Sequence, residues 1–151
     1  MKTRSRSLSL MVCLAALLLL ASCTAGTAPT STDSIQGIVW QWTSVSNQST
    51  GETTTVPNPE SYTITFNGDG TLNGKADCNN FNGTYSQDNG FTINLGATTM
   101  AFCGEASLDQ PYLALLGSVA AGGPDGAGGL ALETAGGEQR MLFKNGGTAT
   151  E

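Results

Sequence analysis

Two alternating segments separated by a turn sequence constrain the fold of this chain more than any other feature. Over residues 62–66 apolar side chains alternate with threonine, and the alternation resumes over residues 71–76. A period of two places successive side chains on opposite faces of a β-strand. Residues 67–70 between the segments read NGDG, which are the residues that tight hairpin turns require. The chain is therefore predicted to contain an antiparallel hairpin.

Further short strands are predicted around this hairpin. We expect them at residues 38–42, 83–86, 91–95 and 98–102, with a closing hairpin that pairs 130–132 with 140–143. Many short strands with turn residues between them are typical of small antiparallel sheets and open barrels. The predicted fold class is therefore mainly β, a small antiparallel sheet or open barrel with one helix.

That single helix is predicted to begin at Ser107. Ser107 and Gln110 have capping-box spacing, and Pro111 falls in the first turn, where a missing N–H costs least. Apolar residues then recur at helical spacing, namely Leu108, Tyr112, Leu115, Leu116 and Val119. The glycine-rich residues 121–129 are expected to end the helix and to form a loose loop.

The N-terminus predicts export and lipidation. Three cations within the first six residues precede an apolar run at residues 8–21, which is the pattern of a secretory signal peptide. The run is shorter than the roughly 20 residues of a membrane-spanning helix. Residues 20–23 read LASC and resemble the lipobox of bacterial lipoproteins, in which the cysteine, here Cys23, becomes the lipid-carrying first residue. An ordinary signal peptide with an incidental cysteine is the alternative.

The chain is accordingly divided into three parts. Residues 1–22 are the predicted lipoprotein signal peptide, residues 23–34 a small, polar and flexible tether, and residues 35–147 one domain. This organisation predicts an exported protein held at a membrane of the cell envelope by the lipid on Cys23. In a cell with two membranes, Thr24 in place of an aspartate after the cysteine permits sorting to the outer membrane.

Composition limits the chemistry that the chain can perform. There is no histidine, which excludes Ser-His-Asp and Cys-His catalytic pairs and histidine-ligated zinc or haem. Residues 23–151 carry three basic and twelve acidic side chains, a net charge of −9. A surface of that sign repels nucleic acids and anionic lipids and attracts cationic proteins. We therefore expect no cofactor, no metal site and no nucleic-acid partner, whereas a cationic protein suits the charge.

Two cysteines remain for the exported domain. Cys13 belongs to the predicted signal peptide and Cys23 to the anchor, which leaves Cys78 and Cys103. An oxidising compartment permits a disulfide between them. That bridge would close a loop of about 25 residues and stabilise the domain by roughly 3.5 kcal/mol in the chain-entropy model. Two buried free thiols and a metal-binding pair are the alternatives.

Two motifs in the domain resemble a known family. They are Cys78-Asn79-x-Phe81-x-Gly83-x-Tyr85 and Thr98-Thr99-Met100-Ala101-x-Cys103. Together with Trp40-x-Trp42 and residues 62–66, they are similar to the META domain, the HslJ-like heat-shock group, over residues 35–145. The resemblance implies a small β-rich domain, often lipid-anchored in the bacterial envelope and linked to stress and antibiotic tolerance. It implies no established enzymatic activity.

The signature residues of this resemblance are interpreted as structural and not as catalytic. They are Asn79, Gly83, Tyr85, Thr99 and Met100. Gly83 suits a turn or bulge, and Asn79 is able to bond nearby backbone. Phe81, Tyr85 and Met100 are expected in the core.

Three functions follow from these observations as hypotheses. The first is a non-enzymatic structural or interaction role in envelope stress. The second is a barrel that holds a small apolar ligand, and the third is inhibition of a cationic envelope-acting enzyme such as lysozyme. An apolar cavity would favour the second hypothesis, and a protruding loop with ordered polar residues the third. A filled barrel with neither feature would favour the first.

Overall fold

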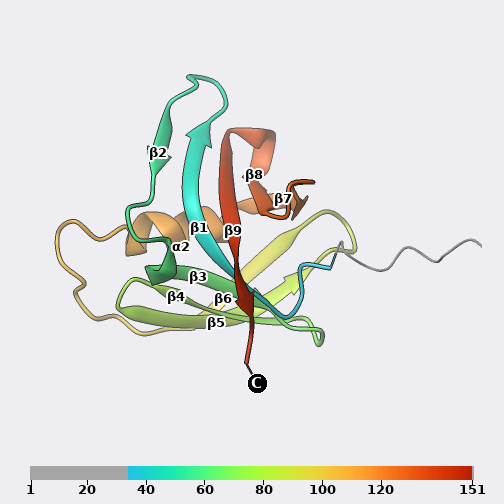
Figure 1. The fold of residues 1–151 in the computed structure, drawn as a ribbon, viewed down its shortest axis with the longest axis horizontal. Helices are drawn as coiled ribbons and strands as arrows, with labels where there is room; N and C mark the ends of the chain where they lie inside the picture. Colours follow the sequence, from blue (N-terminus) through green and yellow to red (C-terminus); the bar gives the residue numbers. More distant parts are fainter. Residues whose placement is uncertain (1–33, 151) are drawn as a thin grey trace, which may run out of the picture. The chain divides into compact units, whose positions relative to one another are not determined.

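This computed structural model describes residues 34–150, and one antiparallel sheet is the main element of that part of the chain (Figure 1). The strand order is β6-β5-β4-β3-β1-β9-β8-β7, with the short β2 beside β1. The strands are β1 (Ile38–Asn47), β2 (Thr53–Thr55), β3 (Tyr62–Phe66), β4 (Thr71–Ala76), β5 (Asn79–Ser86), β6 (Thr92–Thr98), β7 (Val119–Pro124), β8 (Leu130–Thr134) and β9 (Gln139–Thr148). The other elements are the helix α2 (Asp109–Gly117) and the short 3₁₀ turns η1 (Pro59–Ser61) and η2 (Ala135–Gly137). The predicted signal peptide and Cys23 lie outside the described residues, as does the predicted tether up to residue 33.

The hairpin predicted at residues 62–76 is present. All five residues of β3 pair with β4. In the turn, the N–H of Gly70 donates to the Asn67 carbonyl at 3.2 Å, and Gly70 has a φ of +84°, which costs glycine little. The Asp69 carboxylate accepts the hydroxyl of Thr71 at 2.6 Å and its N–H at 2.9 Å. These two bonds stabilise the charged form and so lower the pKa of Asp69.

The sheet curls until its two outer strands approach each other. The N–H of Phe91, just before β6, donates to the carbonyl of Ala120 in β7 at 3.0 Å. The curl gives a concave face on which alternate side chains of each strand are buried. Its innermost residues include Trp40, Trp42, Ile64, Phe66, Leu72, Phe81, Leu130, Leu132, Met141 and Phe143. The predicted class is therefore confirmed as a half-open, mainly β barrel.

Helix α2 packs into this concave face. Tyr112 and Leu116 are both 0% exposed. The Tyr112 ring stacks on Trp42 with centroids 5.0 Å apart and meets Tyr62 edge-on at 5.7 Å. The helix therefore supplies the side chains that fill the middle of the half-barrel.

The helix is shorter at both ends than predicted. The capping box does not form, because Leu108 holds the N-cap position without a side-chain bond and the Ser107 hydroxyl accepts the N–H of Asp109 at 3.2 Å. The Leu108 N–H instead donates to the Tyr62 hydroxyl at 2.9 Å, so a tertiary contact sets the first turn. At the other end, Val119 begins β7.

The glycine-rich residues 121–129 were predicted to be a loose loop, but only residues 125–129 are a loop. Residues as far as Pro124 form β7, paired with β8. Gly122 lies opposite Leu132, and a Cβ at Gly122 would collide with the Leu132 side chain and stand 3.0 Å from the Ala131 carbonyl. Pairing with β8 supplies hydrogen-bond partners for the backbone of β7. The absence of a side chain on Gly122 lets the two strands approach each other.

Candidate functional site

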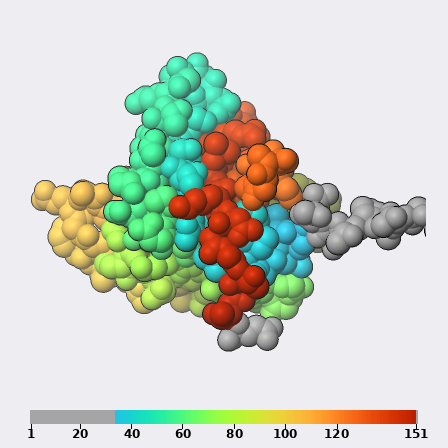
Figure 2. Space-filling model, viewed as in Figure 1, coloured from blue at the N-terminus to red at the C-terminus, as the bar shows by residue number. Residues whose placement is uncertain are grey.

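A loop held by a disulfide projects from one end of the half-barrel (Figures 1 and 2). We define the bridged loop as residues 99–108, which join β6 to α2. Cys103 in this loop is bonded to Cys78, with Cα atoms 5.6 Å apart. Cys78 lies in the β4–β5 turn, where Asp77 has a φ of +58°. The predicted disulfide is confirmed in the structure, and the alternatives of free thiols and a metal-binding pair are wrong.

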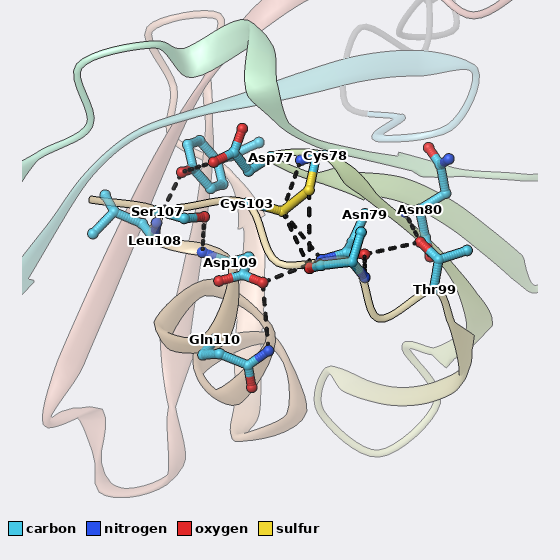
Figure 3. Close-up of a disulfide and its surroundings, with 12 residues drawn as sticks. Asp77, Cys78, Asn79, Asn80, Thr99, Cys103, Ser107, Leu108, Asp109 and Gln110 are labelled. Carbon is cyan, nitrogen blue, oxygen red and sulfur yellow. Dashed lines mark hydrogen bonds between the residues drawn. A yellow bond between two sulfur atoms is a disulfide. The ribbon is translucent and has the colours of Figure 1, made fainter. Parts of the chain in front are cut away.

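Asn79, the first residue of β5, holds the start of the bridged loop (Figure 3). Its side-chain oxygen accepts the N–H of Ala101 at 2.7 Å and the hydroxyl of Thr99 at 3.1 Å. Its side-chain nitrogen lies 3.0 Å from the Ala101 carbonyl, 3.2 Å from the Cys103 sulfur and 3.2 Å from the Asp109 carboxylate. Asn79 is 1% exposed, so a buried amide connects β5, the loop and α2.

Further bonds hold both ends of the loop. The Thr99 hydroxyl accepts the N–H of Asn80 at 2.9 Å, and the Thr99 N–H donates to the Asn80 carbonyl at 2.9 Å. At the other end, the Leu108 N–H donates to the Tyr62 hydroxyl, which itself lies 3.4 Å from the Asp77 carboxylate. The loop is therefore fixed to the sheet at its beginning, at Cys103 and at its end.

This attachment leaves two large apolar side chains in solvent. Met100 is 89% exposed and Phe102 is 84% exposed. The expectation that Met100 is a core residue is therefore wrong. Thr99 and Cys103 turn toward the sheet, where they are bonded, and the backbone of Ala101 is held by Asn79. The residues between these attachment points consequently face solvent. The segment 98–102 is also not the predicted strand, since β6 ends at Thr98.

The remaining signature residues lie along β5, away from the loop. Gly83 faces Leu95 beside the bulge in the β5–β6 pairing, and a Cβ on it would collide with the Asn94 carbonyl, as expected of a glycine at a bulge. Tyr85 is buried, and its hydroxyl donates to the Asn67 carbonyl at 2.9 Å. Phe81 is buried as predicted. The structure therefore brings Asn79 and Thr99 together with the disulfide, whereas Gly83 and Tyr85 stabilise the sheet.

Two residues of the site were missed by the sequence analysis. Phe102 was assigned only to a predicted strand, and Asp109 was given no role. Asp109 is 9% exposed, and its carboxylate takes bonds from Asn79 at 3.2 Å and Gln110 at 3.4 Å. The sequence does contain a signal for Phe102. Residues 100–102 are apolar and stand between the polar Thr99 and the disulfide-bonded Cys103.

Acidic side chains share this end of the domain. Glu105 is exposed in the bridged loop, and Glu60 is exposed in η1. The η1 turn adjoins the β4–β5 turn, since the N–H of Asp77 donates to the Ser61 carbonyl at 2.7 Å. Among residues 34–150, no group of three or more cysteine, aspartate or glutamate residues is arranged to hold a metal ion.

Among residues 34–150, buried side chains fill the concave face of the sheet. The concave face is occupied by Trp42, Tyr112 and Leu116, all 1% exposed or less. A hollow of about 520 Å³ lies instead on the surface, between α2 and the β8–η2 segment, with Leu115 and Ala135 in its lining. In the described part of the chain, no helix is long and apolar enough to span a bilayer.

The fold defines a class of small, curled antiparallel sheets with one helix in the concave face. The NMR structure of a protein from Burkholderia xenovorans has a TM-score of 0.59 and 21% identity, and the match covers 78% of this chain and 88% of that one. The crystal structure of a DUF4847 family protein from Bacteroides vulgatus has a TM-score of 0.55 and 15% identity, with 73% and 93% covered. At these identities the likeness shows the fold alone.

The family model of the META domain matches residues 33–147. The protein therefore belongs to the META domain family, as the two motifs indicated. No curated protein matches the chain.

Proposed function

We propose that this protein is a lipid-anchored cell-envelope protein whose META domain acts by binding a partner through the bridged loop, without catalysing a reaction. One observation carries the proposal. Met100 and Phe102 are 89% and 84% exposed on a loop whose inward-facing groups are bonded to the sheet. Large apolar side chains on a loop that is already fixed to the sheet suit an interaction site, because binding removes them from water without the cost of ordering the loop.

The polar groups of the site support binding over catalysis. The side chains of Asn79 and Thr99 are occupied in holding the loop, and the Asp109 carboxylate accepts two side-chain bonds. Groups used in this way position the loop and are not free to act on a substrate. The filled interior of the half-barrel likewise gives less support to a small apolar ligand than to a partner on the surface.

The expected gain from such binding is substantial. Full burial of a phenylalanine or methionine side chain contributes about 1.5–3 kcal/mol each. The two residues together therefore offer about 3–6 kcal/mol, or roughly a hundredfold to ten-thousandfold in Kd. Because the loop is fixed in advance, little of this free energy is lost in ordering it. Inhibition of a cationic enzyme such as lysozyme would be one form of this binding.

The anchor is supported by residues 1–23 of the sequence. The test compares the wild type with Cys23→Ser after metabolic labelling with a fatty acid and fractionation of the cells. We expect label and membrane association in the wild type and neither in the variant. Equal membrane association of both proteins would refute the lipid anchor.

The role of the loop is tested by complementation of a deletion strain under envelope stress and antibiotic exposure. The double variant Met100→Ser/Phe102→Ser is expected to lose function, whereas Thr54→Ala on the exposed strand β2 is expected to keep it. Both variants should unfold within about 0.5 kcal/mol of the wild type, because the altered side chains are in solvent. Full complementation by the double variant would exclude the loop as the functional site.

A further inference from the structure

We propose that the partner of the bridged loop is a cationic protein, in which an apolar pocket with lysine or arginine residues at its rim receives Met100 and Phe102. This inference rests on the proposed function and specifies the chemistry of the partner. It combines three observations: the apolar side chains, the charges around them, and the position of the loop relative to the start of the domain.

The charges around the loop are mainly negative. Glu105 is three residues beyond Phe102 and exposed, Glu60 is exposed in the neighbouring η1 turn, and Asp77 is partly exposed beside Cys78. An exposed cation, Lys75 on β4, also lies at this end. Apolar side chains with acidic neighbours complement a pocket with a basic rim, because opposite potentials favour encounter and correct orientation.

The loop lies at the opposite end of the central hairpin from the start of the described chain. Gln36 forms a bridge with Phe66 at the end of β3, whereas the loop is attached to Tyr62 at the beginning of β3. If the chain is held through the residues before Ser34, Met100 and Phe102 are at the far end of the hairpin from that attachment, where the anchor does not cover them.

The charges near the bridged loop also argue against two other binding partners. A bilayer with anionic lipids would repel Glu105 and Glu60, and residues 99–108 contain no lysine or arginine to offset this. A second copy of this chain would bring the same acidic residues face to face, which is unfavourable. A cationic protein avoids both costs and gains from burial of the apolar pair.

Site-specific photo-crosslinking of the full chain in the cells that make it tests the inference. A benzophenone amino acid replaces Phe102, and the same amino acid at Thr54 on β2 is the control position. Two charge reversals are then added separately, Glu105→Lys in the loop and Glu52→Lys in the exposed β1–β2 turn. They change the net charge equally and differ only in position. Thermal unfolding of each purified variant confirms the fold.

We expect a discrete protein adduct from position 102 that position 54 lacks, with the crosslinked peptide in a basic surface of the partner. Glu105→Lys should lower its yield about tenfold, whereas Glu52→Lys should leave it nearly unchanged. In an envelope extract, raising NaCl from about 0.05 M to about 0.5 M should reduce the yield as the charges are screened.

Four other outcomes overturn the inference. If the yield of the protein adduct is unchanged by Glu105→Lys and by salt, the partner has no basic rim around its pocket, and the proposed function is unaffected. Adducts with lipid alone, or with a second copy of this chain alone, refute a cationic protein partner. The absence of any adduct specific to position 102 refutes both the inference and the proposed binding function.

Discussion

Replacing Tyr112 with phenylalanine is expected to stabilise the protein. Tyr112 is 0% exposed, and its hydroxyl has no hydrogen-bond partner among residues 34–150. Its ring stacks on Trp42 and lies edge-on to Phe81, with centroids 5.0 Å and 6.1 Å away. Phenylalanine keeps these ring contacts and removes the unpaired hydroxyl.

The magnitude follows from the cost of burying an unpaired polar group, about 1–3 kcal/mol. The free energy of unfolding of Tyr112→Phe should therefore exceed that of the wild type by about 1–3 kcal/mol. A folded domain of this size gains roughly 0.25 kcal/mol/K of entropy on unfolding, so the expected rise in Tm is about 4–12 °C.

Urea unfolding followed by tryptophan fluorescence measures this change, because Trp40 and Trp42 are both buried in the core. The midpoint should rise while the slope with urea stays constant. Tyr62→Phe is the matched control, since the Tyr62 hydroxyl accepts the Leu108 N–H at 2.9 Å. This control removes the same atom and should lose about 1 kcal/mol. If Tyr112→Phe proves neutral or destabilising while Tyr62→Phe destabilises, the Tyr112 hydroxyl has a hydrogen-bond partner in the folded protein and is not the unpaired group described above.

Three other predictions follow from the packing. Burial raises the pKa of Tyr112 well above its usual value, so the folded state keeps a proton that the unfolded state releases. The free energy of unfolding should therefore fall above about pH 10, by up to about 1.4 kcal/mol per pH unit from this group, and urea unfolding of Tyr112→Phe should lack that component. Asn79→Ala removes the bonds to the bridged loop and should lower the free energy of unfolding by about 3–5 kcal/mol, whereas the exposed Asn80→Ala should change it by less than about 0.5 kcal/mol; equal losses would contradict the assigned role. Gly74→Ala drives a methyl group into the Thr63 carbonyl oxygen and the Phe81 ring, with an expected cost of about 1–3 kcal/mol or more in the same assay. Gly123→Ala, which meets open space, should differ little.

The sequence by itself determined the elements that local pattern specifies. The alternation over residues 62–66 and 71–76, with its turn, specifies a hairpin because a strand places every second side chain on one face. The helical spacing of Tyr112 and Leu116 specifies a helix with one buried face. The two motifs identified the family, and Cys78 and Cys103 are the pair of cysteines within the predicted domain.

Only the tertiary structure decided the features that depend on a distant partner. Gly122 is in a strand because β8 supplies the backbone groups that bond to it, and no local pattern carries that information. The orientation of Met100 depends on Asn79, about twenty residues earlier, which holds the loop so that Thr99 and Cys103 turn inward. An apolar side chain indicates burial only when the fold offers it an inner face, and here attachment of the neighbouring residues leaves Met100 and Phe102 in solvent. The candidate binding site therefore arises from long-range bonds, while the sheet that supports it could be predicted from local pattern.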